Sequence, residues 1–148
     1  DSTPFQWQVT ATDNAGNTRT QTQIITIDKT RPSLVSAAVG IAWDSETSQE
    51  VTGVNTAIKL VFSEDIDSPS VSKSDFTVTV DAVSQTVSSA EVRGEYSFRS
   101  PYVYLTLVEG LASDAEPVVS LVGNISDPAG NDLSPGGPGN SVTASPME

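Results

Sequence analysis

The sequence has 148 residues, with 7 Lys and Arg against 19 Asp and Glu, a net charge of −12, and neither Cys nor His. This charge balance disfavours nucleic-acid binding, which needs clustered basic side chains. The missing Cys and His exclude disulfides, thiolate metal sites, His-based triads and His general bases. The sequence contains no run of about 20 apolar residues, so no transmembrane segment is predicted. The chain opens on Asp1 without an initiator Met or a signal peptide, so we expect a fragment or a processed chain.

A β-hairpin is predicted at the start of the chain. Apolar and polar residues alternate over 5–11, which indicates a half-buried strand. The turn at 13–17 contains Asn and Gly, which tolerate a positive φ, and residues 18–27 return as a Thr- and Ile-rich strand. A hairpin alone is marginal in water. Residues 1–28 are therefore interpreted as the terminal hairpin of a preceding unit, with the alternative that they pair with the chain beyond residue 28.

A second unit is expected after a linker at 29–33, where Pro32 disfavours helix and lacks a ladder donor. It occupies residues 34–148 and contains seven short strand-like stretches separated by Gly, Pro, Ser and Asp. They lie at about 34–43, 56–62, 75–80, 86–92, 102–108, 117–123 and 139–144. Seven short strands with turn signals between them favour an all-β sandwich. Only 64–73 and 109–116 are expected to hold a short helical turn each.

One motif occurs twice. The turn Asp13-Asn-Ala-Gly-Asn17 has a second copy at Asp127-Pro-Ala-Gly-Asn131. Each copy precedes the final strand of its unit, so the repetition indicates two domain ends within one chain.

Four segments, taken in order, resemble a known family. They are Val61-Phe62-Ser63-Glu64, Ser74-Asp75-Phe76-Thr77-Val78, Val103-Tyr-Leu-Thr-Leu107 and Ile125-Ser-Asp-Pro-Ala-Gly-Asn131. Together they resemble the bacterial and archaeal Ig-like repeats of the SwmB and S-layer Ig-like type, over residues 33–144. Residues 7–32 look like the close of another such repeat. The resemblance implies an immunoglobulin-like β-sandwich of about seven strands, preceded by a β-hairpin from an adjacent Ig-like unit.

The resemblance also implies a setting and a role. Such tandem repeats belong to extracellular or cell-surface proteins, such as S-layer proteins, adhesins or filaments, where they act as non-catalytic spacers and some bind calcium. The expected partners are neighbouring Ig-like domains of the same or an adjacent chain, including by strand addition. The alternative is a carbohydrate- or ligand-binding module of a secreted protein. An enzyme is not expected, because the sequence shows no cleft with paired carboxylates and no phosphate-loop motif.

A structural Ca²⁺ is the one cofactor considered, because the two turns, the linker and one acidic loop carry side-chain oxygens. The candidate ligands are Asp13, Asn17, Asp28, Asp65, Asp67, Asp127 and Asn131. The alternative, which we favour, is that both turns are Asx turns with Gly at a positive φ. The loop at 64–67 is likewise better explained as solvated, since its spacing does not match an EF-hand.

Two further kinds of site are expected on the surface. Tyr102 and Tyr104 lie on one face of their strand and are a candidate exposed pair for sugar binding, with Tyr96 or Trp43 nearby. Alternatively, they cover the outer sheet or contact a neighbouring module. Asn124 begins an N-x-S/T sequon and is a candidate glycosylation site.

Overall fold

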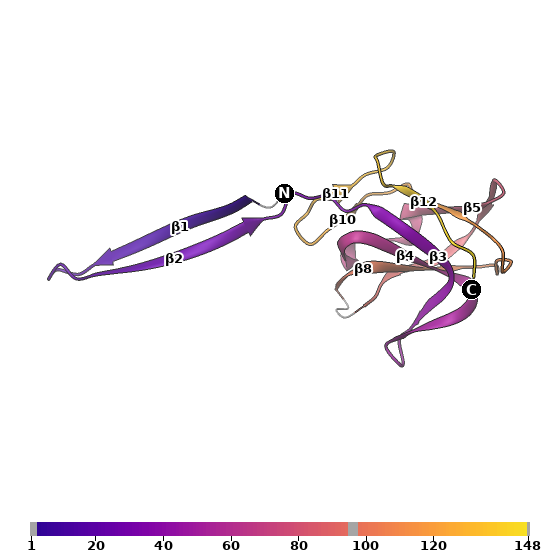
Figure 1. The fold of residues 1–148 in the computed structure, drawn as a ribbon, viewed down its shortest axis with the longest axis horizontal. Helices are drawn as coiled ribbons and strands as arrows, with labels where there is room; N and C mark the ends of the chain where they lie inside the picture. The colour runs from indigo at the N-terminus through magenta and orange to yellow at the C-terminus, as the bar shows by residue number, and fades with distance from the viewer. Residues whose placement is uncertain (1–2, 95–97, 148) are drawn as a thin grey trace. The chain divides into compact units, whose positions relative to one another are not determined.

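The computed structural model describes residues 3–94 and 98–147. The chain divides into two compact units, Asp1–Thr30 and Arg31–Glu148 (Figure 1). The described residues form β-strands and two short 3₁₀ turns, so the all-β expectation is confirmed.

The first unit is an antiparallel hairpin of β1 (Thr3–Thr12) and β2 (Thr18–Ile27). Its described side chains are all exposed. One face is mostly Thr and Gln, and hydroxyl pairs such as Thr10 with Thr20, 3.1 Å apart, lie across the strands. The opposite face carries large apolar side chains that are about half exposed; they are Phe5, Trp7, Val9, Ile25 and Ile27. The hairpin is therefore amphipathic, as the alternation predicts.

The second unit is built from two antiparallel four-stranded sheets. The first sheet runs in the order β3 (Leu34–Asp44), β4 (Gln49–Asp67), β8 (Arg99–Leu107) and β7 (Val87–Val92). The second runs in the order β12 (Ser141–Thr143), β9 (Val118–Leu121), β5 (Phe76–Val80) and β6 (Val83–Gln85). A small third pairing joins β10 (Ile125–Ser126) to β11 (Asp132–Leu133).

The core lies between the inner faces of these sheets. Alternate residues of each strand point inward, as a pleated strand requires. Ile58 and Leu60 of β4 and Val103 and Leu105 of β8 are completely buried. Phe76, Val78, Val119 and Leu121 face them from the second sheet. The predicted inward faces of 56–62 and 102–108 are thus the ones observed.

Main-chain segments connect the two sheets along both edges of the sandwich. On one side Thr86 alone separates β6 from β7, so the chain passes directly from one sheet to the other. On the other side the segment after β12 reaches β3, where Ser145 forms a parallel bridge with Ala38. The Val39 N–H donates to the Ser145 carbonyl at 2.9 Å, and the Ser145 N–H donates to the Ala37 carbonyl at 3.0 Å.

The β3–β4 hairpin extends past the sandwich as an arm, defined here as residues 40–54. The β3–β4 register shifts on both sides of Gly40, whose φ is +88°. A Cβ at Gly40 would lie 2.5 Å from the Met147 Cγ, so glycine is required for both conformation and space. Irregular pairing of this kind bends a strand pair. The arm therefore begins at a bend.

The structure differs from the predicted elements in four ways. Strand β4 covers Gln49–Asp67 rather than 56–62, so the acids at 64–67 lie on a strand and not in a loop. The extension at 49–55 was missed because this segment shows no apolar alternation. The 3₁₀ turns are Ser68–Ser70, inside the predicted 64–73, and Lys73–Asp75, which overlaps its end. Residues 109–116 form no helix. The two-residue strands β10 and β11 were too short for a periodic signal.

Candidate functional site

The two copies of the D-x-A-G-N turn have the same hydrogen bonds. The Asp127 Oδ1 accepts from the backbone N–H groups of Ala129 and Asn131, both at 2.8 Å, and its Oδ2 accepts from the Asn131 side-chain amide at 2.8 Å. In the first copy Asp13 accepts the equivalent three bonds at 2.9, 2.9 and 2.8 Å. Both turns are therefore Asx turns, and each Asp carboxylate is occupied by donors of its own turn.

The two turns differ in their surroundings. Asp127 is 3% exposed, whereas the Asp13 side chain lies in the exposed hairpin. The side-chain amide of Asn17, and then its backbone N–H, lower the pKa of Asp13 below its usual range. Donors that stabilise a carboxylate in this way favour its charged form. The same motif thus serves as a fully exposed turn in one unit and, in the other, as a turn with an exposed tip and a buried Asp.

The predicted calcium ligands are distributed over both units. Asp28 lies in the first unit, where its Oδ1 accepts from the Thr30 N–H at 2.9 Å and this bond lowers the pKa of Asp28. In the second unit Asp65 is 3.7 Å from the Arg99 guanidinium. Within the described residues, neither Asp65 nor Asp67 belongs to a cluster of three acids suited to a metal ion.

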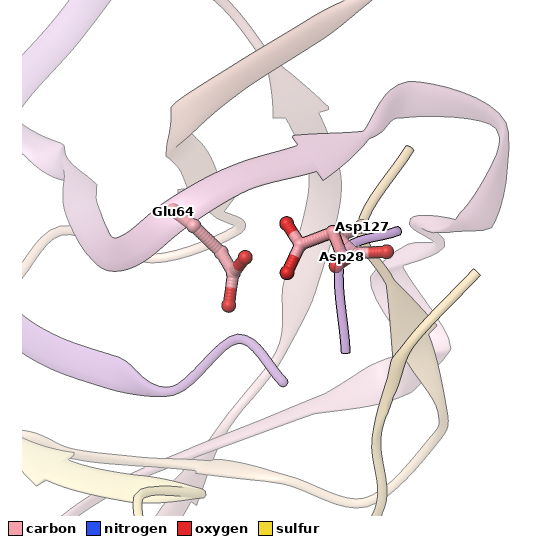
Figure 2. A group of neighbouring side chains, drawn as sticks. All are labelled: Asp28, Glu64 and Asp127. Carbon is pink, nitrogen blue, oxygen red and sulfur yellow. The ribbon is translucent and has the colours of Figure 1, made fainter. Parts of the chain in front are cut away.

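Within the second unit, the acid that lies beside Asp127 is Glu64 (Figure 2). Oxygens of the two carboxylates are within 4.8 Å of one another. Ca²⁺ takes six to eight oxygen ligands. Two carboxylates, one of them already accepting three hydrogen bonds, supply only part of such a shell. The sequence placed Glu64 in the acidic loop but could not show that β4 brings it to the second turn.

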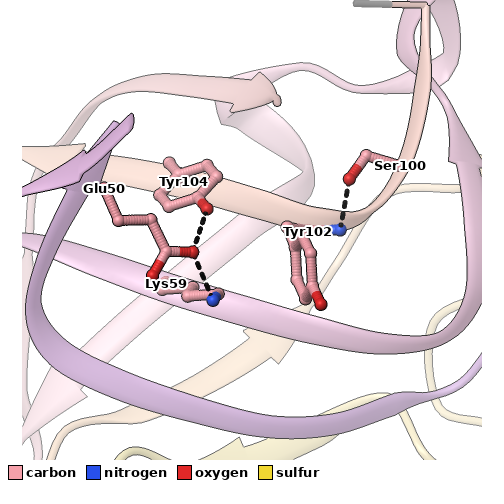
Figure 3. Close-up of polar contacts among 5 residues, drawn as sticks. All are labelled: Glu50, Lys59, Ser100, Tyr102 and Tyr104. Carbon is pink, nitrogen blue, oxygen red and sulfur yellow. Dashed lines mark hydrogen bonds and ion pairs between the residues drawn. The ribbon is translucent and has the colours of Figure 1, made fainter. Parts of the chain in front are cut away.

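A polar network lies on the outer face of the β3-β4-β8-β7 sheet (Figure 3). The Glu50 Oε1 accepts hydrogen bonds from the Lys59 ammonium and from the Tyr104 hydroxyl, the latter at 2.7 Å. The Lys59 Nζ lies 4.2 Å from the centre of the Tyr102 ring. The rings of Trp43 and Tyr104 are 5.8 Å apart between centroids.

This network shows that the arm folds back. Glu50 and Lys59 are nine residues apart on β4, and an extended strand of that length spans about 30 Å. Their ion pair therefore requires the bend at the base of the arm. The bend is what places Trp43 and Glu50 over Tyr104, and no periodicity in the sequence signals it.

The titration of this network follows from its contacts. Burial alone would raise the pKa of Glu50, but the hydrogen bonds from Lys59 and Tyr104 outweigh it and lower the pKa. Burial, followed by the bond to the Glu50 carboxylate, raises the pKa of Tyr104 above its usual range.

We expect Glu50→Gln to destabilise the second unit more at pH 7 than at pH 3. The folded state lowers the pKa of Glu50 below 4.5, its value in an unfolded chain, so its stabilisation is present above that pH and is lost as pH falls through the folded pKa. The effect is modest because the Glu50 side chain is 37% exposed to solvent. Urea unfolding of wild type and variant at both pH values measures it. Glu46→Gln on the same arm is the control, and an equal difference at both pH values would contradict the assignment.

The expected exposed tyrosine pair does not form. Tyr104 is only 5% exposed, because the folded-back arm brings Trp43 and Glu50 against it, while Tyr102 is partly buried. The premise of two exposed rings side by side was therefore wrong for Tyr104. Of the other aromatic residues expected nearby, Trp43 contacts Tyr104, and Tyr96 lies outside the described residues.

The sequon has one accessible residue at its start. Asn124 is exposed, whereas Ile125 is completely buried and the Ser126 N–H donates to the Ser70 Oγ at 3.1 Å. Glycosylation of Asn124 stays a prediction.

The fold and these sites can be compared with known proteins. The family model described as a bacterial Ig-like domain matches residues 28–141. The chain belongs to this family. The expected Ig-like β-sandwich and the resemblance to bacterial Ig-like repeats are thus confirmed.

Solved structures similar to this Ig-like chain include parts of a bacterial S-layer protein. The N-terminal part of the S-layer protein SbsC is 21% identical with a TM-score of 0.54, over 77% of this chain and 23% of that one. Domains 1–6 of surface layer protein SbsC are 19% identical with a TM-score of 0.56, over 79% of this chain and 14% of that one. At these identities the likeness shows the fold. The Ig-like chain spans less than a quarter of either chain.

Two other comparisons complete the description. No curated protein matches the Ig-like chain. Among the described residues, no helix has the length and apolar character needed to cross a membrane.

Proposed function

We propose that this Ig-like chain is a non-catalytic structural module of a cell-surface protein. The observation that carries the proposal is the closed Ig-like sandwich of residues 31–148, whose fold is shared with domains of a multidomain S-layer protein. The contacts of two acids support this structural role. The Asp127 carboxylate accepts hydrogen bonds within its own turn, and the Glu50 carboxylate joins the arm to the sheet. An adhesin or filament protein would use such a module in the same way, as a spacer between other domains.

A domain exchange in the parent protein tests this proposal. Replacing residues 31–148 with another Ig-like module of equal length should preserve surface assembly, because a spacer contributes length and rigidity rather than a specific surface. Deleting the module should disturb assembly. Loss of assembly after the exchange would instead show that the module contributes a specific surface.

We also propose that residues 1–28 are the terminal hairpin of another Ig-like unit. The support is the repeated turn. Ile125 and Leu133, which flank the second copy, are buried in the core at 0% and 5% exposure. Ala11 and Arg19 occupy the equivalent positions and share a face with Phe5, Trp7 and Val9. The apolar face of the hairpin is therefore the face that a sandwich core would cover.

Residues 31–148 produced alone are expected to fold and remain monomeric, since they contain the whole buried core. Circular dichroism and size-exclusion chromatography with light scattering measure this. Failure to fold, or a loss of unfolding cooperativity, would mean that the hairpin belongs to this module.

Calcium stiffening is the remaining prediction for the module. A calcium site in the second unit would raise its Tm when CaCl₂ is added, and a chelator would reverse the rise, because an ion bound only to the folded state stabilises by mass action. Glu64→Gln should reduce the increase, since Glu64 lies beside Asp127 (Figure 2). Measurements at matched ionic strength separate binding from screening. Stabilisation by NaCl alone, with no added effect of CaCl₂, would show that the acids form only a solvated surface.

A further inference from the structure

A pocket lies between the arm and the outer face of the first sheet. Its volume is about 210 Å³. The arm contributes Trp43 and Ser45, and the sheet contributes Glu91 of β7 with Tyr104 and Thr106 of β8. This is smaller than the roughly 300–1,000 Å³ of pockets that hold drug-sized ligands. The pocket therefore fits a single ring rather than an extended molecule.

Two kinds of surface meet in this pocket. The Trp43 indole lies against the covered Tyr104 ring, with the two ring planes inclined at 47°. Hydroxyl groups of Ser45 and Thr106 can both donate and accept hydrogen bonds, and the Glu91 carboxylate accepts. A ligand that suits this lining has an apolar face for the rings and hydroxyl groups at its edge.

The charges around the pocket favour an uncharged ligand. The Glu91 Oε2 is bound by Arg93, with its Nη2 at 2.8 Å and its Nε at 3.0 Å, so the negative charge of Glu91 is balanced. The chain carries a net charge of −12, which disfavours an anionic ligand. The lining therefore suits a neutral polyhydroxylated ring.

The arm holds the pocket in shape before any ligand arrives. Glu50 on the arm is bonded to both Lys59 and Tyr104 of the sheet (Figure 3). Trp43 pairs with Glu50 across the arm, so the same contacts fix the position of the indole. A wall fixed in advance lowers the entropic cost of binding.

We propose that this pocket binds one neutral sugar ring of a glycan. The ring stacks an apolar face on the Trp43 indole, and its hydroxyl groups donate to Glu91 and exchange hydrogen bonds with Ser45 and Thr106. This role is additional to that of a structural module and does not depend on it. Trp43 rather than the Tyr102–Tyr104 pair is the principal contact.

The test is carried out in a Trp7→Phe background. This change is confined to the hairpin unit and leaves Trp43, in the pocket, as the single tryptophan. Cellotetraose, mannotetraose, xylotetraose and chitotetraose are titrated separately against the fluorescence of Trp43. At least one should give a saturable change, and ¹H–¹⁵N spectra should show the Thr106 amide shifting with the same curve. Glu91→Gln in this background should weaken that binding about tenfold or more, because a charged acceptor is lost.

Two controls make the result decisive. Glu116→Gln removes an exposed acid that does not line the pocket and should leave the affinity unchanged. In the Trp43→Ala variant, binding is monitored only by the NMR signal of the Thr106 amide. The saturable shift should be lost while the unfolding transition persists. No saturable response to any of the four oligosaccharides, or equal affinity in Glu91→Gln, overturns the proposal. A response to choline but to none of the sugars also overturns it, since the pocket would then bind a cation.

Discussion

Replacing Ile58 with alanine is expected to lower the free energy of unfolding of the second unit by about 2–5 kcal/mol, the usual cost of such a truncation in a core. Ile58 is completely buried at the centre of β4, the strand that lies between β3 and β8. The substitution removes apolar contacts and leaves a cavity that two pleated sheets cannot easily close. The Tm should fall by roughly 10 °C or more.

Urea unfolding followed by the fluorescence of Trp43, in the Trp7→Phe background, measures this change in the second unit. Val83→Ala is the matched control, because Val83 also lies on a strand but is 63% exposed. Its effect should stay within about 0.5 kcal/mol, as for most surface substitutions. Equal losses for the two variants would mean that the core does not lie between the sheets as described.

Asp127→Ala is expected to destabilise the second unit by about 2–3 kcal/mol, because it leaves three donors of a partly buried turn without their acceptor. The turn connects β10 to β11, and Ile125 and Leu133 on either side of it pack into the core. Loss of the turn therefore also loosens these two contacts. The same urea experiment measures the change.

Asp13→Ala provides an internal comparison, since it removes the same three hydrogen bonds from the first copy of the turn. Water can replace the lost acceptor there, because the turn is exposed. The unfolding of the second unit, reported by Trp43, should be unchanged. If Asp13→Ala destabilised that transition as much as Asp127→Ala, the two units would not unfold independently.

The strands that follow a simple period could be predicted from the sequence. Residues 102–108 alternate strictly, and β8 buries the predicted face with Val103, Leu105 and Leu107. The Asx turns were also readable, because Asp, Asn and Gly at fixed spacing have a local mechanism that does not depend on the rest of the fold. Local rules therefore account for most of the sandwich.

The candidate pocket could not be predicted in this way. Tyr104 points outward, as its position on β8 requires, yet it is buried because a distant hairpin bends over it. The bend depends on Gly40 and on the packing of Met147 against it. Contacts between segments so far apart in the chain leave no periodic trace, so the sequence placed an exposed tyrosine pair where the structure has a covered ring.

The parallel bridge between Ala38 and Ser145 has a mechanical consequence. The two segments run in the same direction, so tension along the chain pulls β3 one way and the C-terminal segment the opposite way. The bonds from the Val39 and Ser145 N–H groups, together with the Leu34 N–H to Gly139 carbonyl bond at 2.7 Å, are then strained in shear at the same time. Bonds sheared together resist more force than bonds that unzip singly, which would appear as a high rupture force when single molecules are stretched through their ends.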